Sequence, residues 1–577
     1  MKKLWPSLRP YIPLILLGVF CSAAEAIFEL LIPMIMSDIV DIGIASGDTA
    51  YIVREGFKMV GMAVLSLIFG VSGAAVSSIA GMGFGANLRK AEYEQIQRYA
   101  FSNIEKFSTA SLVTRLTSDV NALQITLMMS MRIAVRSPVM LVAAIFFSVR
   151  ISARLSSVFL VSLPLLAAVV ATIMVKAGPM FRSLQECTDA LNLVVQENLT
   201  GIRVVKSFVR EEGESEKFRD CNQTLKNTSL RAFGMVVVNM PVMMLIIYST
   251  LIAVMWFGGH MVYAHTLEAG DLMVYFTYIT QIMISLMMFS MMFMMATRAI
   301  ACGRRIAEAL GEPPAITDDA ADPAAQVADG SVDFDAVSFR YHDGDSAWVL
   351  RNVNLHIPSG ATVGILGGTG SGKTSLVSLI PRLYECQEGA VRVGGRPVQD
   401  YTMEHLRSAV SMVLQKNTLF SGSIRDNLLW GNPDATDEEL WEACRTACAD
   451  EFLKAMPDGL DTDLGQGGVN VSGGQKQRLC IARALLAKPK ILILDDSTSA
   501  VDMATDAKIR AAFHSDFPGV TKLIIAQCVA SVMEADCVIV MDNGAIADMG
   551  THSELLERCE IYREVYNSQQ EGVMANG

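Results

Sequence analysis

Residues 367–375, GGTGSGKTS, combine glycines, a lysine and hydroxyl side chains in a spacing that suits phosphate chemistry. The apolar segment ATVGIL precedes them and LVSLI follows, so we predict a strand, a tight loop and a helix. Glycines allow backbone N–H groups to turn toward phosphate oxygens, and a helix N-terminus favours anions. We expect Lys373 to neutralise the terminal phosphates and Thr374 to bind Mg²⁺. The candidate nucleotide-binding residues of this stretch are Gly367, Gly368, Thr369, Gly370, Ser371, Gly372, Lys373, Thr374 and Ser375.

A second candidate group is ILILDDSTSAVD at 491–502, an apolar run that stops at two adjacent carboxylates. An acid at the tip of a buried strand beside a phosphate-binding loop usually provides the second protein ligand of magnesium, and we assign this role to Asp495. Asp496 follows at the place where a general base or a water-positioning carboxylate is expected. The alternative interpretation is that both acids are solvated at the strand end.

The composition shows what kind of chain must position these residues. Of 577 residues, 51% are hydrophobic and only 18% are charged, which is too apolar for an ordinary soluble protein. The apolar runs lie before residue 300, so we predict a multi-domain membrane protein with a soluble C-terminal half. The formal net charge of -12 argues against nucleic acid as a partner, because binding to a phosphate backbone depends on clustered Lys and Arg.

The N-terminal part, residues 1–310, is expected to form an all-α transmembrane domain with six helices. Lys and Arg are concentrated in two long connections, 86–129 and 177–231, whereas 259–271 has neither. Because such residues favour the cytoplasmic side, we place these connections, the N-terminus and the C-terminal half in the cytoplasm. Spans of about 20 apolar residues are predicted near 12–37, 58–82, 132–149, 155–176, 234–258 and 272–296.

Both cytoplasmic connections keep helical periodicity, so the helices are expected to continue beyond the bilayer and to end in short hairpins. We place the tips of these hairpins at 108–120 and 198–218. The tips are suited to contact another domain, and solvated connectors would have the same pattern.

Charged side chains within the spans are costly and mark function or pairing. Glu25 and Glu29 lie on one face of the first span, and Arg132 and Arg136 lie on one face of the third. We predict an intramembrane ion-pair cluster that faces a cavity; the alternative is a position near the inner headgroups. The methionine-rich stretch 283–295 suits varied apolar ligands, although a lipid-facing stripe would have the same composition.

The acidic stretch 311–330, rich in Pro and Ala, is predicted to be a linker between the two halves. Residues 331–577 are expected to form an α/β P-loop nucleotide-binding domain. Its first strand starts at Val332, where apolar and polar residues alternate, and ends at an exposed aromatic residue, Tyr341.

The stretch VSGGQKQRLCIARALLAKPK at 471–490 precedes the acid-tipped strand. Together with GGTGSGKTS, with Gln415 in MVLQKNTLF and with SAVD at 499–502, it resembles the ATP-binding cassette family. Six preceding spans with long cytoplasmic hairpins are similar to a half-transporter of the exporter fold. The resemblance implies ATP and Mg²⁺ as cofactors and a dimer of two cassettes.

The same resemblance implies roles for further residues. Tyr341 would stack on adenine, and Gln415 would link magnesium to the cytoplasmic hairpins, so that the metal set is Thr374, Gln415 and Asp495. Asp502 corresponds to the D-loop of such proteins. The residues expected to bind the nucleotide held by the other cassette are Val471, Ser472, Gly473, Gly474 and Gln475.

Two departures from the family pattern concern the catalytic positions. The family usually has glutamate where this chain has Asp496, and histidine where it has Gln527. A carboxylate displaced by about 1 Å can lose on the order of a hundredfold in positioning water, and a glutamine cannot carry the positive charge that stabilises a transition state. Gln466, just before the signature, also replaces a common acid. The nucleotide site is therefore expected to bind Mg-ATP and to hydrolyse it poorly.

In these features the chain resembles the degenerate-site subunit of bacterial heterodimeric multidrug exporters. The resemblance implies a partner subunit with an intact catalytic glutamate, an amphipathic drug or lipid as substrate, and a location in the inner or plasma membrane. Two alternatives stay open: an importer of siderophore-like compounds with the same fold, and a nucleotide-gated regulatory or channel subunit.

Overall fold

A computed structural model describes residues 2–341, 347–496 and 503–576. The chain forms two compact units. The first comprises Met1–Gln97 and Ala110–Glu312, and the second comprises Arg98–Thr109 and Pro313–Gly577. Most of the predicted linker, 311–330, belongs to the second unit, as does a short piece of the N-terminal half.

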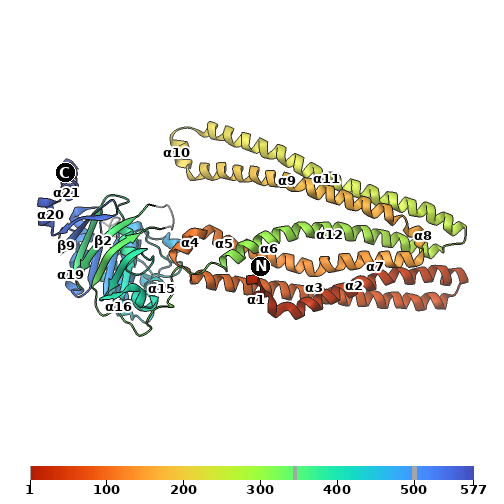
Figure 1. Cartoon of the computed structure of the whole chain (residues 1–577), viewed down its shortest axis with the longest axis horizontal. Coiled ribbons are helices and arrows are strands. Elements are labelled where there is room, and N and C mark those ends of the chain that lie inside the picture. Colours follow the sequence, from red (N-terminus) through yellow and green to blue (C-terminus); the bar gives the residue numbers. More distant parts are fainter. Residues whose placement is uncertain (1, 342–346, 497–502, 577) are drawn as a thin grey trace. The chain divides into compact units, whose positions relative to one another are not determined.

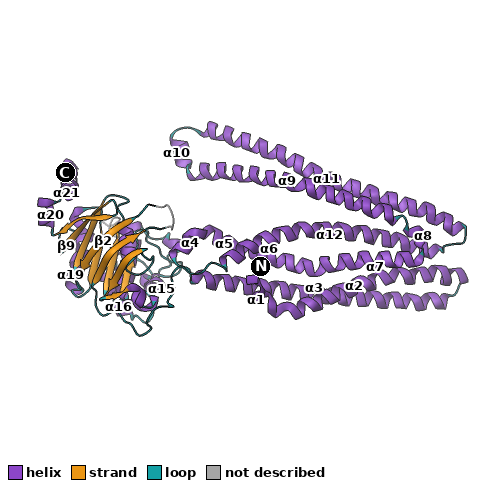
Figure 2. Cartoon of the chain, viewed as in Figure 1, coloured by secondary structure: helices purple, strands orange, loops and turns teal. Residues whose placement is uncertain are grey.

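The first unit is helical (Figure 2). Long helices suit lipid because each backbone polar group is satisfied within its own segment. Its α-helices are α1 (Trp5–Leu8), α2 (Ile12–Asp38), α3 (Thr49–Gln97), α5 (Thr109–Thr114), α6 (Val120–Met129), α7 (Val135–Ile151), α8 (Ala153–Ser156), α9 (Phe159–Thr200), α10 (Ile202–Ser207), α11 (Glu211–Tyr263) and α12 (Ala269–Ala309). Short 3₁₀ and π-helical turns extend or join them: η1 (Lys2–Leu4), η2 (Arg9–Tyr11), η3 (Ile39–Ile44), η4 (Arg115–Asp119) and η5 (Ser130–Ala134).

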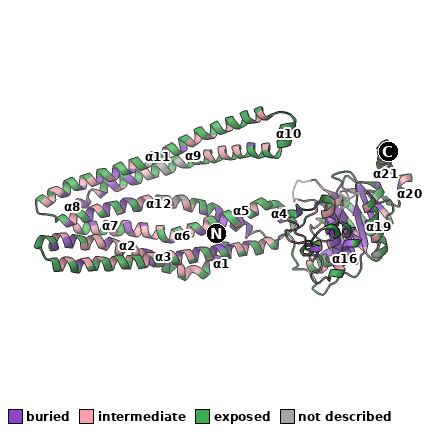
Figure 3. Ribbon diagram, turned by 180° about the vertical axis from the view of Figure 1, so that it is seen from behind, coloured by how far each residue is buried: buried purple, intermediate pink, exposed green. Residues whose placement is uncertain are grey.

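Within the described residues, five of these helical segments are long and apolar enough to cross a membrane. The expected fourth span, 155–176, overlaps a shorter apolar stretch, Ala153–Val169. Figure 3 shows exposed residues along the outer faces of α3 and α11, and many are large and apolar, as a lipid-facing surface requires. The five segments are Trp5–Ile44, Thr49–Gln97, Thr109–Ile151, Glu211–Tyr263 and Ala269–Met288.

The two long connections expected to be cytoplasmic differ in how well the sequence predicts their tips. Helices α9 and α11 lie side by side (Figure 1), and α10 joins them inside the expected tip 198–218. The first tip was placed too late in the sequence: the turn between α3 and α5 falls at residues 98–108, around α4 (Phe101–Phe107). Ser108 ends α4 with a left-handed backbone, φ 59°, and the sequence gives no sign of this turn because it has neither Gly nor Pro there.

The α4 segment packs within the second unit. The buried side chain of Asn103 donates to the carbonyl of Pro313 at 3.1 Å and accepts from the backbone N–H of Ala315 at 2.8 Å. Tyr384 Oη donates to Glu105 Oε1 at 2.7 Å. A piece of the N-terminal half is thus fixed to the start of the C-terminal half and to its fold.

The second unit contains two sheets (Figure 2). The smaller is antiparallel, with strand order β2-β1-β4-β5, and the larger has the order β10-β9-β3-β8-β7-β6, with all neighbours parallel except β10 and β9. The strands are β1 (Val332–Phe339), β2 (Leu350–Ile357), β3 (Thr362–Gly367), β4 (Glu388–Val393), β5 (Arg396–Pro397), β6 (Val410–Val413), β7 (Ile491–Asp495), β8 (Thr521–Ile525), β9 (Cys537–Asp542) and β10 (Ala545–Gly550).

Helices surround the sheets and fix the loops at the strand ends. They are α13 (Lys373–Ser378), α14 (Met403–Ala409), α15 (Ile424–Leu428), α16 (Asp437–Thr446), α17 (Asp450–Ala455), α18 (Gly473–Leu486), α19 (Met503–Asp516), α20 (His552–Arg558) and α21 (Glu560–Asn576). Short 3₁₀ turns are η6 (Val398–Asp400), η7 (Gly459–Asp461), η8 (Gln466–Gly468) and η9 (Val529–Ser531).

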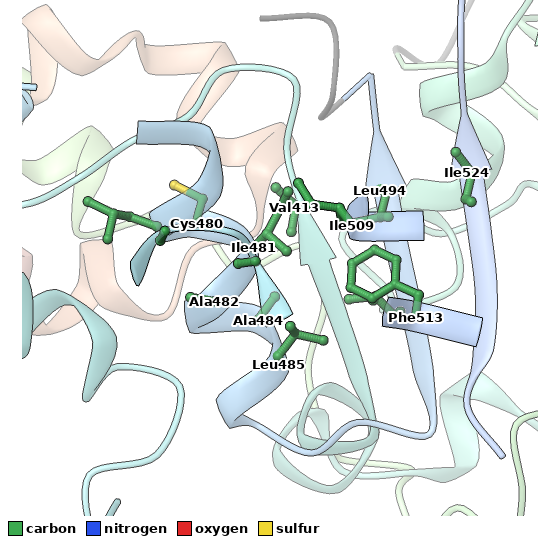
Figure 4. Packing of buried hydrophobic residues seen from close by; sticks show 14 of the residues in the cluster. Val413, Cys480, Ile481, Ala482, Ala484, Leu485, Leu494, Ile509, Phe513 and Ile524 are labelled. Carbon is green, nitrogen blue, oxygen red and sulfur yellow. The ribbon is translucent and has the colours of Figure 1, made fainter. Parts of the chain in front are cut away.

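A continuous core fixes the two elements that carry the candidate site, β7 and α18. All five residues of β7 are buried, as the near-continuous apolar run of a central parallel strand predicts. Figure 4 shows Ile481 and Leu485 of α18 near Val413 of β6, and Phe513 of α19 near Leu494 of β7, all members of one buried cluster. Because side chains in such a core are close-packed, the ends of β7 and α18 have little freedom.

Candidate nucleotide-binding site

The phosphate-binding loop connects β3, a central strand paired with β8 and β9, to α13. Gly370 and Gly372 have φ values of 82° and 95°, in the left-handed region that glycine adopts without strain. At Gly367 a Cβ atom would lie 2.3 Å from the carbonyl oxygen of Met541, so a side chain does not fit there. The backbone of this loop therefore requires glycine at 367, 370 and 372, whereas a Cβ atom at Gly368 would meet no atom within 4 Å.

Lys373, the first residue of α13, lies over the loop. Its Nζ atom donates to the carbonyl oxygens of Gly367 and Gly368, both at 2.8 Å. Burial lowers the pKa of its ammonium group, while the nearby carboxylates of Asp495 and Asp496 oppose that shift. The arrangement places a positive charge at a loop whose backbone N–H groups could bind phosphate oxygens.

Thr374 and Asp495 bring two oxygen ligands together. Thr374 Oγ1 donates to Asp495 Oδ1 at 3.1 Å, across a sequence separation of 121 residues. Asp495 ends β7 and is 2% exposed. Burial raises the pKa of its carboxyl group, and the neighbouring Asp496 adds to this effect. A hydroxyl and a buried carboxylate fit Mg²⁺, which prefers oxygen ligands and whose charge would compensate the cost of burying Asp495.

Asp496 and Gln527, the two positions predicted to be catalytic, meet in the structure. Asp496 Oδ2 accepts a hydrogen bond from Gln527 Nε2 at 2.7 Å, and Gln415 Nε2 lies 3.5 Å from the same oxygen. Asp496 has a left-handed backbone, φ 50°, and its N–H donates to the carbonyl of Ile525 at 3.1 Å. The ends of β6, β7 and β8 thus bring together three positions that are far apart in the sequence.

Tyr341 lies beside the loop at the end of β1. Its hydroxyl and Ser375 Oγ are hydrogen-bonded at 2.7 Å. Its ring packs edge-on against Phe339 and Tyr384, with centroid distances of 5.0 and 5.1 Å. Sequence analysis did not single out Tyr384, because nothing local shows that it packs against an aromatic residue 43 positions earlier.

The signature segment starts α18 with a capping box. Ser472 Oγ accepts from the N–H of Gln475 at 3.3 Å, and Gln475 Oε1 accepts from the N–H of Ser472 at 2.8 Å. Val471 is buried in the core, whereas Ser472 and Gly473 are exposed at the helix N-terminus. Such a terminus, with exposed N–H groups, can bind an anion supplied from outside.

Three other positions complete the comparison with the sequence. Asp502 lies outside the described residues. Gln466 is exposed in η8, and the structure gives it no role. Gln477, which sequence analysis missed, is buried, and its Nε2 atom lies 3.5 Å from the carbonyl oxygen of Asp496. This contact connects α18 to Asp496.

In the first unit, the charged residues of α2 and α7 are joined. Arg136 Nη1 lies 2.6 Å from Glu25 Oε1, and Arg136 Nη2 pairs with Glu29. Gln281 of α12, which sequence analysis missed, donates to Glu29 Oε1 at 3.1 Å. Arg132 forms no ion pair within the part of the chain that the structure describes, and it lines one cavity with Glu25 and Arg136.

The methionines of the stretch 283–295 whose side chains are described do not share one environment. Met283 is buried in the helical core, whereas Met288 lines the cavity that contains Arg132. Figure 1 shows α12, which carries this stretch, beside α7.

Comparison with known proteins agrees with this architecture. Residues 15–287 match the family model described as ABC transporter transmembrane region, and residues 350–499 match the family model described as ABC transporter. The uncharacterized ABC transporter ATP-binding protein YfiB of Bacillus subtilis is 36% identical over 572 residues, covering 99% of this chain and 98% of the relative. YheI of the same organism, described as a probable multidrug resistance ABC transporter ATP-binding/permease protein, is 33% identical over 468 residues, covering 81% and 80%.

Among solved structures, a bacterial Atm1-family ABC exporter with ATP bound matches with a TM-score of 0.79 and 22% identity, covering 97% of this chain and 98% of that one. At this identity the match shows the fold. The chain therefore belongs to the ABC transporter family, as a half-transporter with the exporter fold. The predicted fold class, a helical transmembrane domain followed by an α/β nucleotide-binding domain, is confirmed.

Proposed function

We propose that this chain is one subunit of a heterodimeric exporter whose own nucleotide site binds Mg-ATP but hydrolyses it poorly. The observation that carries the proposal is the pair Asp496 and Gln527, hydrogen-bonded at 2.7 Å at the two catalytic positions. The shorter acid leaves its carboxylate about 1 Å from the place that a glutamate reaches, which can cost about a hundredfold in rate. Gln527 donates a hydrogen bond to a phosphate without bringing a full positive charge.

The residues that this chain needs to bind the nucleotide at its own loop are all present. The loop N–H groups and Lys373 hold the phosphates, while Thr374 and Asp495 would hold Mg²⁺. When bound, the ion neutralises charge between the β- and γ-phosphates. Tyr341 offers an aromatic surface beside the loop for the adenine ring. The nucleotide site of this chain is thus suited to hold Mg-ATP for longer than a site that hydrolyses it quickly.

The signature helix supports the need for a partner. Ser472 and Gln475 satisfy two terminal N–H groups through their capping box. The other N–H groups at the start of α18 are suited to bind an anion from another chain. One chain alone cannot complete a site, because the loop and the signature that bind one nucleotide come from two cassettes. A partner with a glutamate at its own catalytic position would gain a competent site from this signature.

The substrate class and the location follow from the membrane unit. Its long apolar helices and its similarity to YheI, a probable multidrug resistance transporter, favour export of amphipathic drugs or lipids across the bacterial inner or plasma membrane. The Lys and Arg of the two long connections favour a cytoplasmic nucleotide-binding domain.

The test compares ATP hydrolysis by the purified chain with hydrolysis after co-expression with a candidate partner subunit that bears the glutamate. We expect negligible turnover by the chain alone and restored turnover in the complex. Asp496→Asn should barely change the complex, because the working site is built on the partner's loop. Fast hydrolysis by a dimer of this chain with itself would overturn the proposal.

A further inference from the structure

A cavity of about 390 Å³ lies within the first unit, between the segments that carry the charged cluster. Its polar lining consists of Glu25, Arg132, Arg136, Ser137, Gln281 and Ser285. The rest is apolar and partly methionine, a surface that adapts to varied alkyl chains. The combination of a few polar groups with apolar walls is typical of a small-molecule site.

The charges of this cavity are not equivalent. Arg136 is engaged by both Glu25 and Glu29, and Gln281 gives Glu29 a second donor. Arg132 is exposed to the cavity and has no ion-pair partner among the described residues. A guanidinium group in apolar surroundings is costly without an anion, and it offers five N–H donors to one.

The backbone at Arg132 is also unusual. Arg132 lies in η5 (Ser130–Ala134), a π-helical turn between α6 and α7. Such turns are rare and often occur at functional sites, because they shift side chains around the helix axis. Arg136 lies one turn later, in regular α-helix, and faces its two carboxylates.

From this arrangement we propose that Arg132 binds the anionic group of an amphipathic substrate whose apolar tail occupies the methionine-lined part of the cavity. This inference rests on the proposed export of amphipathic molecules and specifies their chemistry. Glu25, Glu29 and Arg136 together carry one excess negative charge, so they disfavour a second anionic group on the ligand. The substrate is therefore an amphiphile with a single anionic group, either a carboxylate or a phosphodiester.

The test measures equilibrium binding to the full chain in nanodiscs of phosphatidylcholine, without ATP or a partner subunit. The probes are palmitate, phosphatidylglycerol and the cationic palmitoylcholine, which share alkyl tails and differ in headgroup. We expect saturable binding of an anionic probe and at least about tenfold weaker binding of palmitoylcholine, because an anion forms charge-assisted hydrogen bonds to arginine. Binding of palmitate alone would indicate a free amphiphile, and binding of phosphatidylglycerol alone would indicate a lipid.

Variants connect the selectivity to the residue. Arg132→Gln should weaken binding of the anionic probe about tenfold or more, and Arg132→Lys should retain most of it. Arg132→Glu should reverse the preference toward palmitoylcholine. The control is Arg150→Gln, which removes a cation at the other end of α7, where it lies over the ring of Phe146, outside the cavity.

The proposal would be overturned by wild-type protein that prefers the cationic probe, or by an Arg132→Gln variant with unchanged affinity. The wild-type selectivity decides the matter even if a variant fails to fold. Because binding is measured without hydrolysis, an active dimer of this chain with itself would overturn the degenerate site and leave this inference intact.

Discussion

Lengthening the acid at position 496 should restore hydrolysis to this chain. In the structure Asp496 Oδ2 lies 2.7 Å from Gln527 Nε2, at the shared ends of β7 and β8. Asp496→Glu adds one carbon–carbon bond, about 1.5 Å, and moves the carboxylate toward the position of a bound γ-phosphate. With about a hundredfold in rate for 1 Å of displacement, the variant should gain about 2.7 kcal/mol of transition-state stabilisation. Adding Gln527→His should increase the rate further, because a histidine can carry charge.

The assay is steady-state phosphate release by the purified chain, reconstituted as a dimer with itself in nanodiscs, at saturating Mg-ATP. Asp496→Asn is the matched control, since it keeps the length of the native side chain and removes its charge. A second control combines Asp496→Glu with Lys373→Ala, which should abolish the gain because the ammonium lies over the phosphate loop at 2.8 Å from two of its carbonyls.

The reasoning would be refuted by an Asp496→Glu variant that binds ATP normally and hydrolyses no faster than the native chain. It would also be refuted if the native chain already turned over at rates typical of an enzyme, about 1–1000 per second. Nucleotide affinity must be measured in parallel, so that a loss of binding is not read as a failure of chemistry.

Two further predictions concern other parts of the site. In the complex with a partner, Ser472→Ala should abolish turnover by removing a cap of the signature helix, whereas Lys373→Ala should only lower turnover. Equal losses in the phosphate-release assay would contradict the proposed difference between the site on this chain's loop and the site on the partner's loop. Because the pKa of Asp495 is raised above its usual value, protons should compete with Mg²⁺ at a higher pH than for an ordinary aspartate. Mg-ATP affinity should therefore fall as the pH decreases toward the raised pKa of Asp495. The Asp495→Asn variant should lack this pH dependence in calorimetric titrations.

Sequence reasoning succeeded where a motif carries its own structural context. The phosphate loop lies between an apolar strand and a helix, so Lys373 and Thr374 could be placed from local residues alone. Asp495 could be placed because it directly follows four apolar residues, Ile491 to Leu494, and ends β7. The charged pairs of α2 and α7 could be suggested from helical spacing.

Other features depend on contacts between distant segments, which no local pattern encodes. Gln281 reaches Glu29 across 252 positions, and Gln477 reaches Asp496 from a different element. The first hairpin tip was misplaced for a related reason, because Ser108 breaks the helix by a left-handed backbone without the usual Gly or Pro. Side chains such as Tyr384 become part of a site only through packing.

The polypeptide passes between the two units three times, after Gln97, after Thr109 and after Glu312. A protease that severs the chain once, just beyond Glu312, would therefore leave the halves tethered through residues 98–109. A recombinant fragment beginning at Pro313 would lose the side chain of Asn103 and the acceptor of the Tyr384 hydroxyl. Such a fragment does not reproduce the native second unit, and a fragment to which the α4 segment is fused would reproduce it better.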